Sequence, residues 1–220
     1  MKPHQQTLFK EYPTYEDLQK ELSPERLIVA FAGIEYIEQS ISKKRVSLAD
    51  IDELYSTSNK NRAVEYIKDW LSYLAKFIGV KPLIESSAAA YMLYKSHKHL
   101  YLADLKLLLE KISQAEYGKE SMFYGCMNTQ SIYFSFSVYN QERNRIANKF
   151  YQKLEENFAK IKEETEAKEK QRIYNEVAGL YEDKELWELY QERCREEIPG
   201  IIRAKWEEFI NNQSDGNQQK

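Results

Sequence analysis

Turn-forming residues are scarce in this chain of 220 residues, which contains seven glycines and five prolines. A β-sandwich or β-barrel needs many chain reversals and uses far more of both residue types. Hydrophobic residues make up 42% of the chain and charged residues 30%, a balance that suits helices with one buried and one solvated face. We therefore expect an all-α fold: a multi-helix bundle with one long helix and a C-terminal helical appendage.

Cysteines, net charge and long apolar runs are also limited. Cys126 and Cys194 lie far apart and match neither a disulfide framework nor a zinc-finger spacing. The formal net charge of −3, from 32 basic and 35 acidic side chains, gives no general attraction to nucleic acid or to an anionic membrane. No apolar run is long enough to span a bilayer, and the first residues lack the apolar segment of a signal peptide. We expect a cytoplasmic protein without membrane contact.

Sequence patterns that commonly mark enzymes are missing as well. The chain has no glycine-rich phosphate loop, no HExxH, no paired CxxC and no GxSxG. Of its three histidines, His97 and His99 are close in sequence, but no nearby cysteine or carboxylate completes a metal-ligand set. We therefore predict no catalytic residue, no metal site and no cofactor.

Apolar residues recur every three or four positions through most of the chain, which predicts successive helices. The clearest stripe runs from residue 58 to Gly79. Thr14 and Ser47 are each followed three positions later by an aspartate, a variant of the capping box, and are predicted to cap helices. A further helix is expected over residues 24–39.

One long helix is predicted to start near Asn128. Its segment KEETEAKEKQR has no large apolar residue and is typical of a solvated helical stalk. Pro199 and Gly200 are then expected to separate two short amphipathic helices. These patterns divide the chain into an N-terminal tail, a helical body, a charged helical stalk, a C-terminal helical appendage and a disordered tail, at residues 1–13, 14–161, 162–172, 173–212 and 213–220.

Two of the seven glycines, Gly118 and Gly125, each follow a tyrosine between two predicted helices. A loop of this kind on two helices is a candidate site for a partner to bind, because loops held by a rigid scaffold often carry function. The alternative is an ordinary helix end with an aromatic ring tucked under the turn. The candidate contact residues of this loop are Tyr117, Lys119, Phe123 and Tyr124.

Asp104 and Arg143 are charged residues within otherwise apolar helical stripes. A charge on a buried face needs a compensating partner. We therefore predict that they form a structural polar pair across the loop, or that Asp104 caps its own helix.

A set of short motifs spans these same segments, namely Leu102-Ala103-Asp104-Leu105, Tyr117-Gly118-Lys119, Phe123-Tyr124-Gly125, Tyr139 and Arg143. Together they resemble an uncharacterised helical family of Bacteroidetes genomes and their mobile elements. The resemblance implies a cytoplasmic accessory protein of a conjugative or phage element, and it brings no established activity.

Three functions remain open. The first is a non-catalytic interaction protein that binds another protein, or a second copy of itself, through the loop or through anchor-type residues near the C-terminus, namely Trp187, Tyr190, Trp206 and Phe209. The second is a local nucleic-acid-binding accessory protein with phosphate contacts from Lys43, Lys44, Arg45 and Lys119. The third is an enzyme without a familiar motif.

Overall fold

The computed structural model describes residues 3–43, 46–178 and 183–216. The chain divides into two compact units, Met1–Ala147 and Asn148–Lys220. The predicted all-α class is confirmed: across the described ranges the regular elements are helices, with a long helix α9 (Thr129–Val177) and a C-terminal helix α10 (Asp183–Gly216). None of the described helices is both long enough and apolar enough to cross a membrane.

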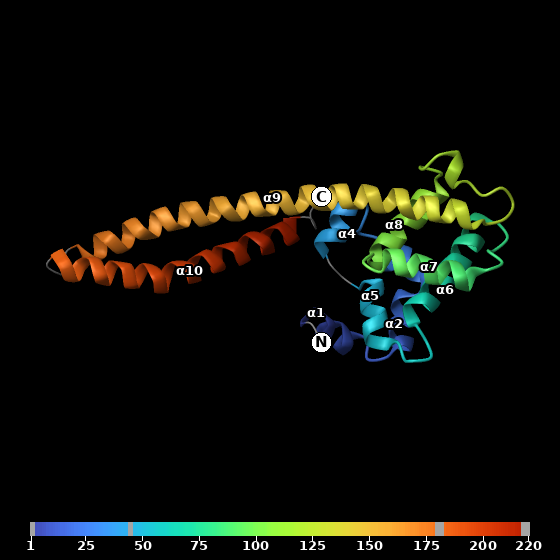
Figure 1. Ribbon diagram of the computed structural model, residues 1–220, viewed down its shortest axis with the longest axis horizontal. Coiled ribbons are helices and arrows are strands. Elements are labelled where there is room, and N and C mark those ends of the chain that lie inside the picture. Colours follow the sequence, from blue (N-terminus) through green and yellow to red (C-terminus); the bar gives the residue numbers. More distant parts are fainter. Residues whose placement is uncertain (1–2, 44–45, 179–182, 217–220) are drawn as a thin grey trace. The chain divides into compact units, whose positions relative to one another are not determined.

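The first unit consists of the amino-terminal part of α9, beside which α7 and α8 lie, and of the helices that precede α9 (Figure 1). In chain order they are α1 (Pro3–Glu11), α2 (Tyr15–Leu22), the 3₁₀ turn η1 (Pro24–Arg26), α3 (Leu27–Ala30), α4 (Ile37–Lys43), α5 (Leu48–Tyr55), α6 (Arg62–Ile78), α7 (Ser86–His97), α8 (Leu102–Ser113) and the 3₁₀ turn η2 (Lys119–Ser121).

The core of this unit lies where α6, α8 and α9 meet. Trp70 of α6 packs edge-on against Phe136 of α9 and donates a hydrogen bond from its indole N–H to the Leu105 carbonyl of α8 at 3.2 Å. Residues 102–109 of α8 are all buried, although the helix carries charged residues as well as its apolar stripe. Its Lys106 is only 4% exposed, and its ammonium group donates to the Ile34 carbonyl and pairs with Glu110.

Helices α5 and α8 begin side by side. The backbone N–H of Leu48 donates to the Leu100 carbonyl, and that of Leu102 donates to the Val46 carbonyl. The predicted Ser47 cap is present as a full capping box with Asp50, and the predicted Thr14 cap accepts from the backbone N–H of residue 17. Paired helix starts of this kind hold two acidic capping residues, Asp50 and Asp104, in the interior.

The segment predicted as an N-terminal tail contains helix α1 instead. Gln5 donates to Asp50 and Glu53 of α5, and Leu8 is buried. This helix has few apolar residues, so the apolar periodicity that revealed the other helices is absent here, and side-chain hydrogen bonds hold it in place.

The single helix predicted over residues 24–39 is wrong, because the chain turns between α3 and α4. Phe31 and Ile34 are both buried around this turn. The amide oxygen of Gln39 accepts from the backbone N–H groups of Glu35 and Tyr36, which satisfies free donors at the start of α4.

The second unit is a helical hairpin, formed by residues 148–177 of α9 and by α10, which run side by side (Figure 1). Its buried cluster joins Ile173 and Val177 of α9 to Ile198 and Ile202 of α10. The predicted break at Pro199 is wrong, because α10 continues through it. Burial of the isoleucines on both sides of Pro199 offsets the loss of one backbone hydrogen bond.

The boundaries of the units differ from those predicted. The first unit ends at Ala147 rather than near residue 161, and the charged segment 162–172 lies within the α9 arm of the hairpin, with Thr165 buried. A small threonine packs there without any large apolar residue to mark the contact. Of the predicted disordered tail, residues 213–216 continue α10 and residues 217–220 lie outside the described residues.

Candidate functional site

The tyrosine-glycine loop is fastened to the body of the first unit. Gly118 and Gly125 have φ angles of 77° and 81°, a left-handed conformation that glycine adopts without strain. The Lys81 backbone N–H donates to the Gly125 carbonyl, and the Met127 N–H donates to the Lys81 carbonyl. Both glycines are therefore explained by backbone geometry alone.

The four predicted loop contacts differ in how far they are exposed. The Lys111 ammonium group lies over the Tyr117 ring, 5.8 Å from the ring centroid. Burial raises the pKa of the Tyr117 hydroxyl. Phe123 is half-buried, whereas Lys119 is exposed and Tyr124 is 77% exposed. Of the basic residues proposed for nucleic-acid contact, Lys43 ends α4, while Lys44 and Arg45 lie outside the described residues.

The aromatic residues of α10 fall into two clusters, each completed by a residue of α9. The first, here called the turn cluster, consists of Trp187 and Tyr190 with Tyr174 of α9. Ring centroids are 5.5 Å apart for Trp187 and Tyr190, and 6.2 Å apart for Tyr174 and Tyr190. Trp187 is nevertheless 60% exposed. A large aromatic side chain held in a cluster but open to solvent is suited to contact with a partner.

The second cluster contains Trp206 and Phe209 of α10 with Phe158 of α9. Trp206 stacks on Phe209 at 5.3 Å and meets Phe158 edge-on at 5.1 Å. The sequence identified the α10 members of both clusters but not Tyr174 or Phe158 as their partners. The register between α9 and α10 decides those pairings, and no local pattern encodes it.

An ionic network clamps the hairpin near the turn cluster. Arg172 pairs with Glu169 and Glu176 on its own helix and with Glu197 of α10, at 2.6–2.7 Å. Arg193 of α10 pairs with Glu176 at 2.9 Å and with Glu197 at 2.7 Å. These contacts lower the pKa of Glu176 and of Glu197, because hydrogen bonds from the two arginines favour the carboxylate form. Such a network keeps the two arms in one register.

Asp104 is the most deeply buried charged group of the first unit, with 0% exposure. Its Oδ1 accepts from the hydroxyls of Ser40 (2.8 Å) and Tyr139 (2.7 Å), and its Oδ2 accepts from Arg143 Nε and from the Tyr101 backbone N–H, both at 2.9 Å. The predicted pairing with Arg143 is thus present, together with the capping role. Burial and the adjacent Asp104 carboxylate raise the pKa of Tyr139. With every acceptor site occupied, this centre is built to hold the fold.

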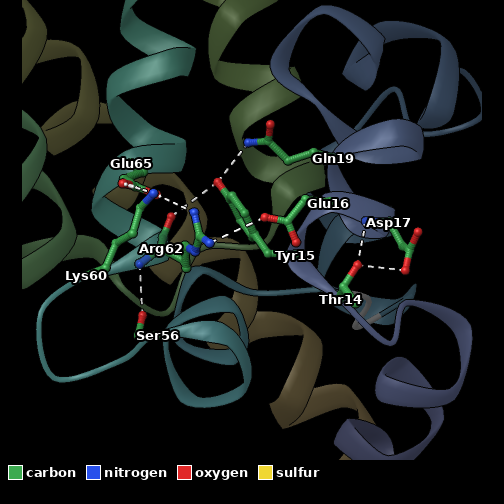
Figure 2. A network of polar contacts seen from close by, with 9 residues as sticks. All are labelled: Thr14, Tyr15, Glu16, Asp17, Gln19, Ser56, Lys60, Arg62 and Glu65. Atoms are coloured by element: carbon green, nitrogen blue, oxygen red, sulfur yellow. Dashed lines mark hydrogen bonds and ion pairs between the residues drawn. The ribbon is translucent and has the colours of Figure 1, made fainter.

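A polar network joins α2 to α6 (Figure 2). Arg62 pairs with Glu65 at 3.0 Å and with Glu16 at 3.4 Å, and its guanidinium lies 4.7 Å from the centroid of the Tyr15 ring. Gln19 donates to the Tyr15 hydroxyl at 2.8 Å. Residues of both charges line the adjoining hollow of about 350 Å³, and the network leaves little uncompensated charge for a ligand.

His97 is buried at the end of α7, with its ring 5.4 Å from that of Phe136 and 6.4 Å from that of His99. Burial, reinforced by the neighbouring His99, lowers the pKa of His97 to about 4. Within the described part of the chain, no group of three or more histidine, cysteine, aspartate or glutamate side chains is placed to bind a metal ion.

We expect His97 to make the first unit sensitive to mild acid. The folded-state pKa of about 4 lies below the unfolded value of 6.5, so between these values the unfolded state binds more protons and stability falls as the pH falls. The loss between pH 7.5 and pH 5 should be about 2 kcal/mol. Urea unfolding at both pH values checks it. His97→Phe should remove this part of the pH dependence, and an unchanged dependence in that variant would contradict the assignment.

No family model, no curated protein and no solved structure matched the chain. The turn cluster of the hairpin is therefore assigned as the candidate functional site on geometry alone, since it combines an exposed aromatic anchor with a clamped support.

Proposed function

We propose that this protein is a non-catalytic helical interaction protein whose hairpin binds another protein through the turn cluster. The observation that carries the proposal is the 60% exposure of Trp187 within a three-ring cluster. Tryptophan and tyrosine are the side chains most enriched among residues that dominate binding energy at protein interfaces. The setting suggested by the family resemblance, an accessory role in a mobile genetic element of a bacterial cytoplasm, is part of this proposal.

The charge on α10 supports a basic partner. Glu188, Glu192 and Glu196 are exposed, follow one another four residues apart, and have no ion pair with another described residue. Negative charge next to an aromatic anchor favours a partner with an apolar pocket beside lysine or arginine side chains. The same stripe repels phosphate, which makes this face unsuitable for nucleic acid.

The ionic clamp supports binding by fixing the cluster in advance. Because Arg172 and Arg193 hold α9 and α10 together, ordering of the hairpin adds little to the entropic cost of association. Partner binding should therefore depend on the identity of the exposed ring rather than on a folding step.

We expect Trp187→Ala to weaken partner binding about 30-fold or more, the effect of losing a central aromatic anchor. Proteins captured by the wild-type chain from producing cells would be identified, and the one lost with Trp187→Ala purified and titrated. Tyr36→Ala removes an equally exposed ring from the first unit and serves as the control.

Glu192→Gln should weaken binding mainly at low salt.

Three results would contradict the proposal. One is that every captured protein is retained equally by Trp187→Ala, and another is that Tyr36→Ala has the same effect as Trp187→Ala. The third is concentration-dependent dimerisation in sedimentation that Trp187→Ala abolishes, because it would make a second copy of the chain the occupant of this surface.

A further inference from the structure

The hairpin contains a hollow of about 420 Å³, and the residues that line it are different from those of the turn cluster. Its lining consists of four residues of α9 and one of α10, namely Tyr151, Leu154, Glu155, Phe158 and Trp206. The four α9 positions are spaced i, i+3, i+4 and i+7, so they share one face of the helix. The volume lies within the range of small-molecule sites.

Aromatic rings form the walls of this hollow and are held in place by their neighbours. Phe158 and Trp206 stand at an interplanar angle of 78°, and Trp206 is backed by Phe209, which stacks on it at 19°. Tyr151 packs edge-on against Phe150. Tyr151 and Phe158 are 40% and 39% exposed, so an incoming group can reach both rings.

Glu155 is the charged member of the lining. None of the five lining residues is lysine, arginine or histidine, and no ion pair joins Glu155 to another described residue. Aromatic faces are electron-rich and attract cations, and a carboxylate adds to that attraction. An anion would be repelled here, a neutral apolar group would desolvate Glu155 without compensation, and one carboxylate is too few to hold a metal ion.

We propose that this hollow binds the alkylammonium group of an organic cation. Methyl groups on the nitrogen would contact Leu154 and the rings, while the positive charge lies near Glu155 and the faces of Phe158 and Trp206. The shared chemistry is a quaternary ammonium group, which can come from a free small molecule or from a trimethylated lysine on a protein.

Calorimetric titration of the full chain with choline tests the site, and an alanine-flanked trimethyl-lysine peptide tests the second source. We expect choline to bind about tenfold more tightly than its neutral isostere 3,3-dimethyl-1-butanol, the difference expected for a cation-aromatic contact supported by a carboxylate. Tighter binding of the peptide than of choline would assign the site to a protein ligand, and the reverse order would assign it to a small molecule.

Substitutions locate the binding. Glu155→Gln and Phe158→Leu should each weaken choline binding about fivefold or more, whereas Glu156→Gln, which changes an exposed carboxylate hydrogen-bonded to Gln152, should leave it unchanged. The indole N–H signal of Trp206, assigned with Trp206→Phe, should shift on titration. Equal binding of the neutral isostere, equal effects of Glu155→Gln and Glu156→Gln, or no binding of either ammonium probe at millimolar concentration would overturn the proposal.

Discussion

Replacing Arg143 by methionine is expected to lower the free energy of unfolding of the first unit by about 3–5 kcal/mol, because it leaves the Asp104 carboxylate buried without its cationic partner. The guanidinium is 2.9 Å from a carboxylate that is fully buried. Methionine fills similar volume, so the lost charge rather than a cavity accounts for the effect. Arg145→Met changes an exposed arginine on the same helix and should alter stability little.

The measurement must separate the two units. The chain has three tryptophans, and in a Trp187→Phe, Trp206→Phe background Trp70 alone reports the core of the first unit. Urea unfolding followed by Trp70 fluorescence then gives the stability of that unit. If Arg143→Met left the midpoint and slope of this transition unchanged, Asp104 and Arg143 would not be coupled in solution.

A substitution of Asp104 distinguishes charge from hydrogen bonding. In Asp104→Asn the amide oxygen can still accept from Arg143 and the Tyr101 N–H, while the amide nitrogen can donate to Ser40 and Tyr139, whose hydroxyls can rotate to accept. We expect a smaller loss than for Arg143→Met. Combined with Arg143→Met, Asp104→Asn should cost less than the sum of the two single changes, because the pair acts as a unit.

The surroundings of Asp104 could be predicted from the sequence only where the interacting residues are close together in the chain or interrupt an apolar pattern. Ser47 and Asp104 mark helix starts through neighbours three residues away, and such local chemistry is readable directly. The Asp104–Arg143 pair was predictable because both charges interrupt apolar stripes. Ser40 was not, since a small hydroxyl just beyond the helix predicted over residues 24–39 has no distinguishing pattern and its contact with Asp104 spans 64 residues.

In the hairpin, by contrast, two predictions from local sequence were wrong. The charged segment 162–172 suggested isolation, yet Thr165 is buried and Arg172 bridges to α10. Pro199 suggested a break, yet flanking isoleucines keep α10 continuous. In both places tertiary burial outweighs a local preference worth a few kcal/mol at most, and such burial can be seen only once α9 and α10 are placed together.

Ile173→Ala is expected to destabilise the hairpin by about 2–4 kcal/mol, because it empties a fully buried position between the two arms. Hydrogen exchange of the intact chain is the suitable measurement, since it reports each segment separately. Amides of α9 beyond residue 160 and of α10 should exchange about 30- to 900-fold faster, while those of α8 stay protected. Gln171→Ala, on an exposed position two residues away, should change exchange little.

Ile173→Ala also distinguishes the residues that support the two proposed binding sites from the residues that contact the bound partner or ligand. The turn cluster and the ammonium-binding hollow each require rings from α9 and α10, so a loosened hairpin should weaken partner capture and choline binding together. Trp187→Ala and Glu155→Gln change exposed side chains and should each weaken one kind of binding while leaving exchange unaltered. If Ile173→Ala exchanged faster but still captured the partner and bound choline normally, neither site would depend on the paired arms. That result would remove the structural basis of both proposals.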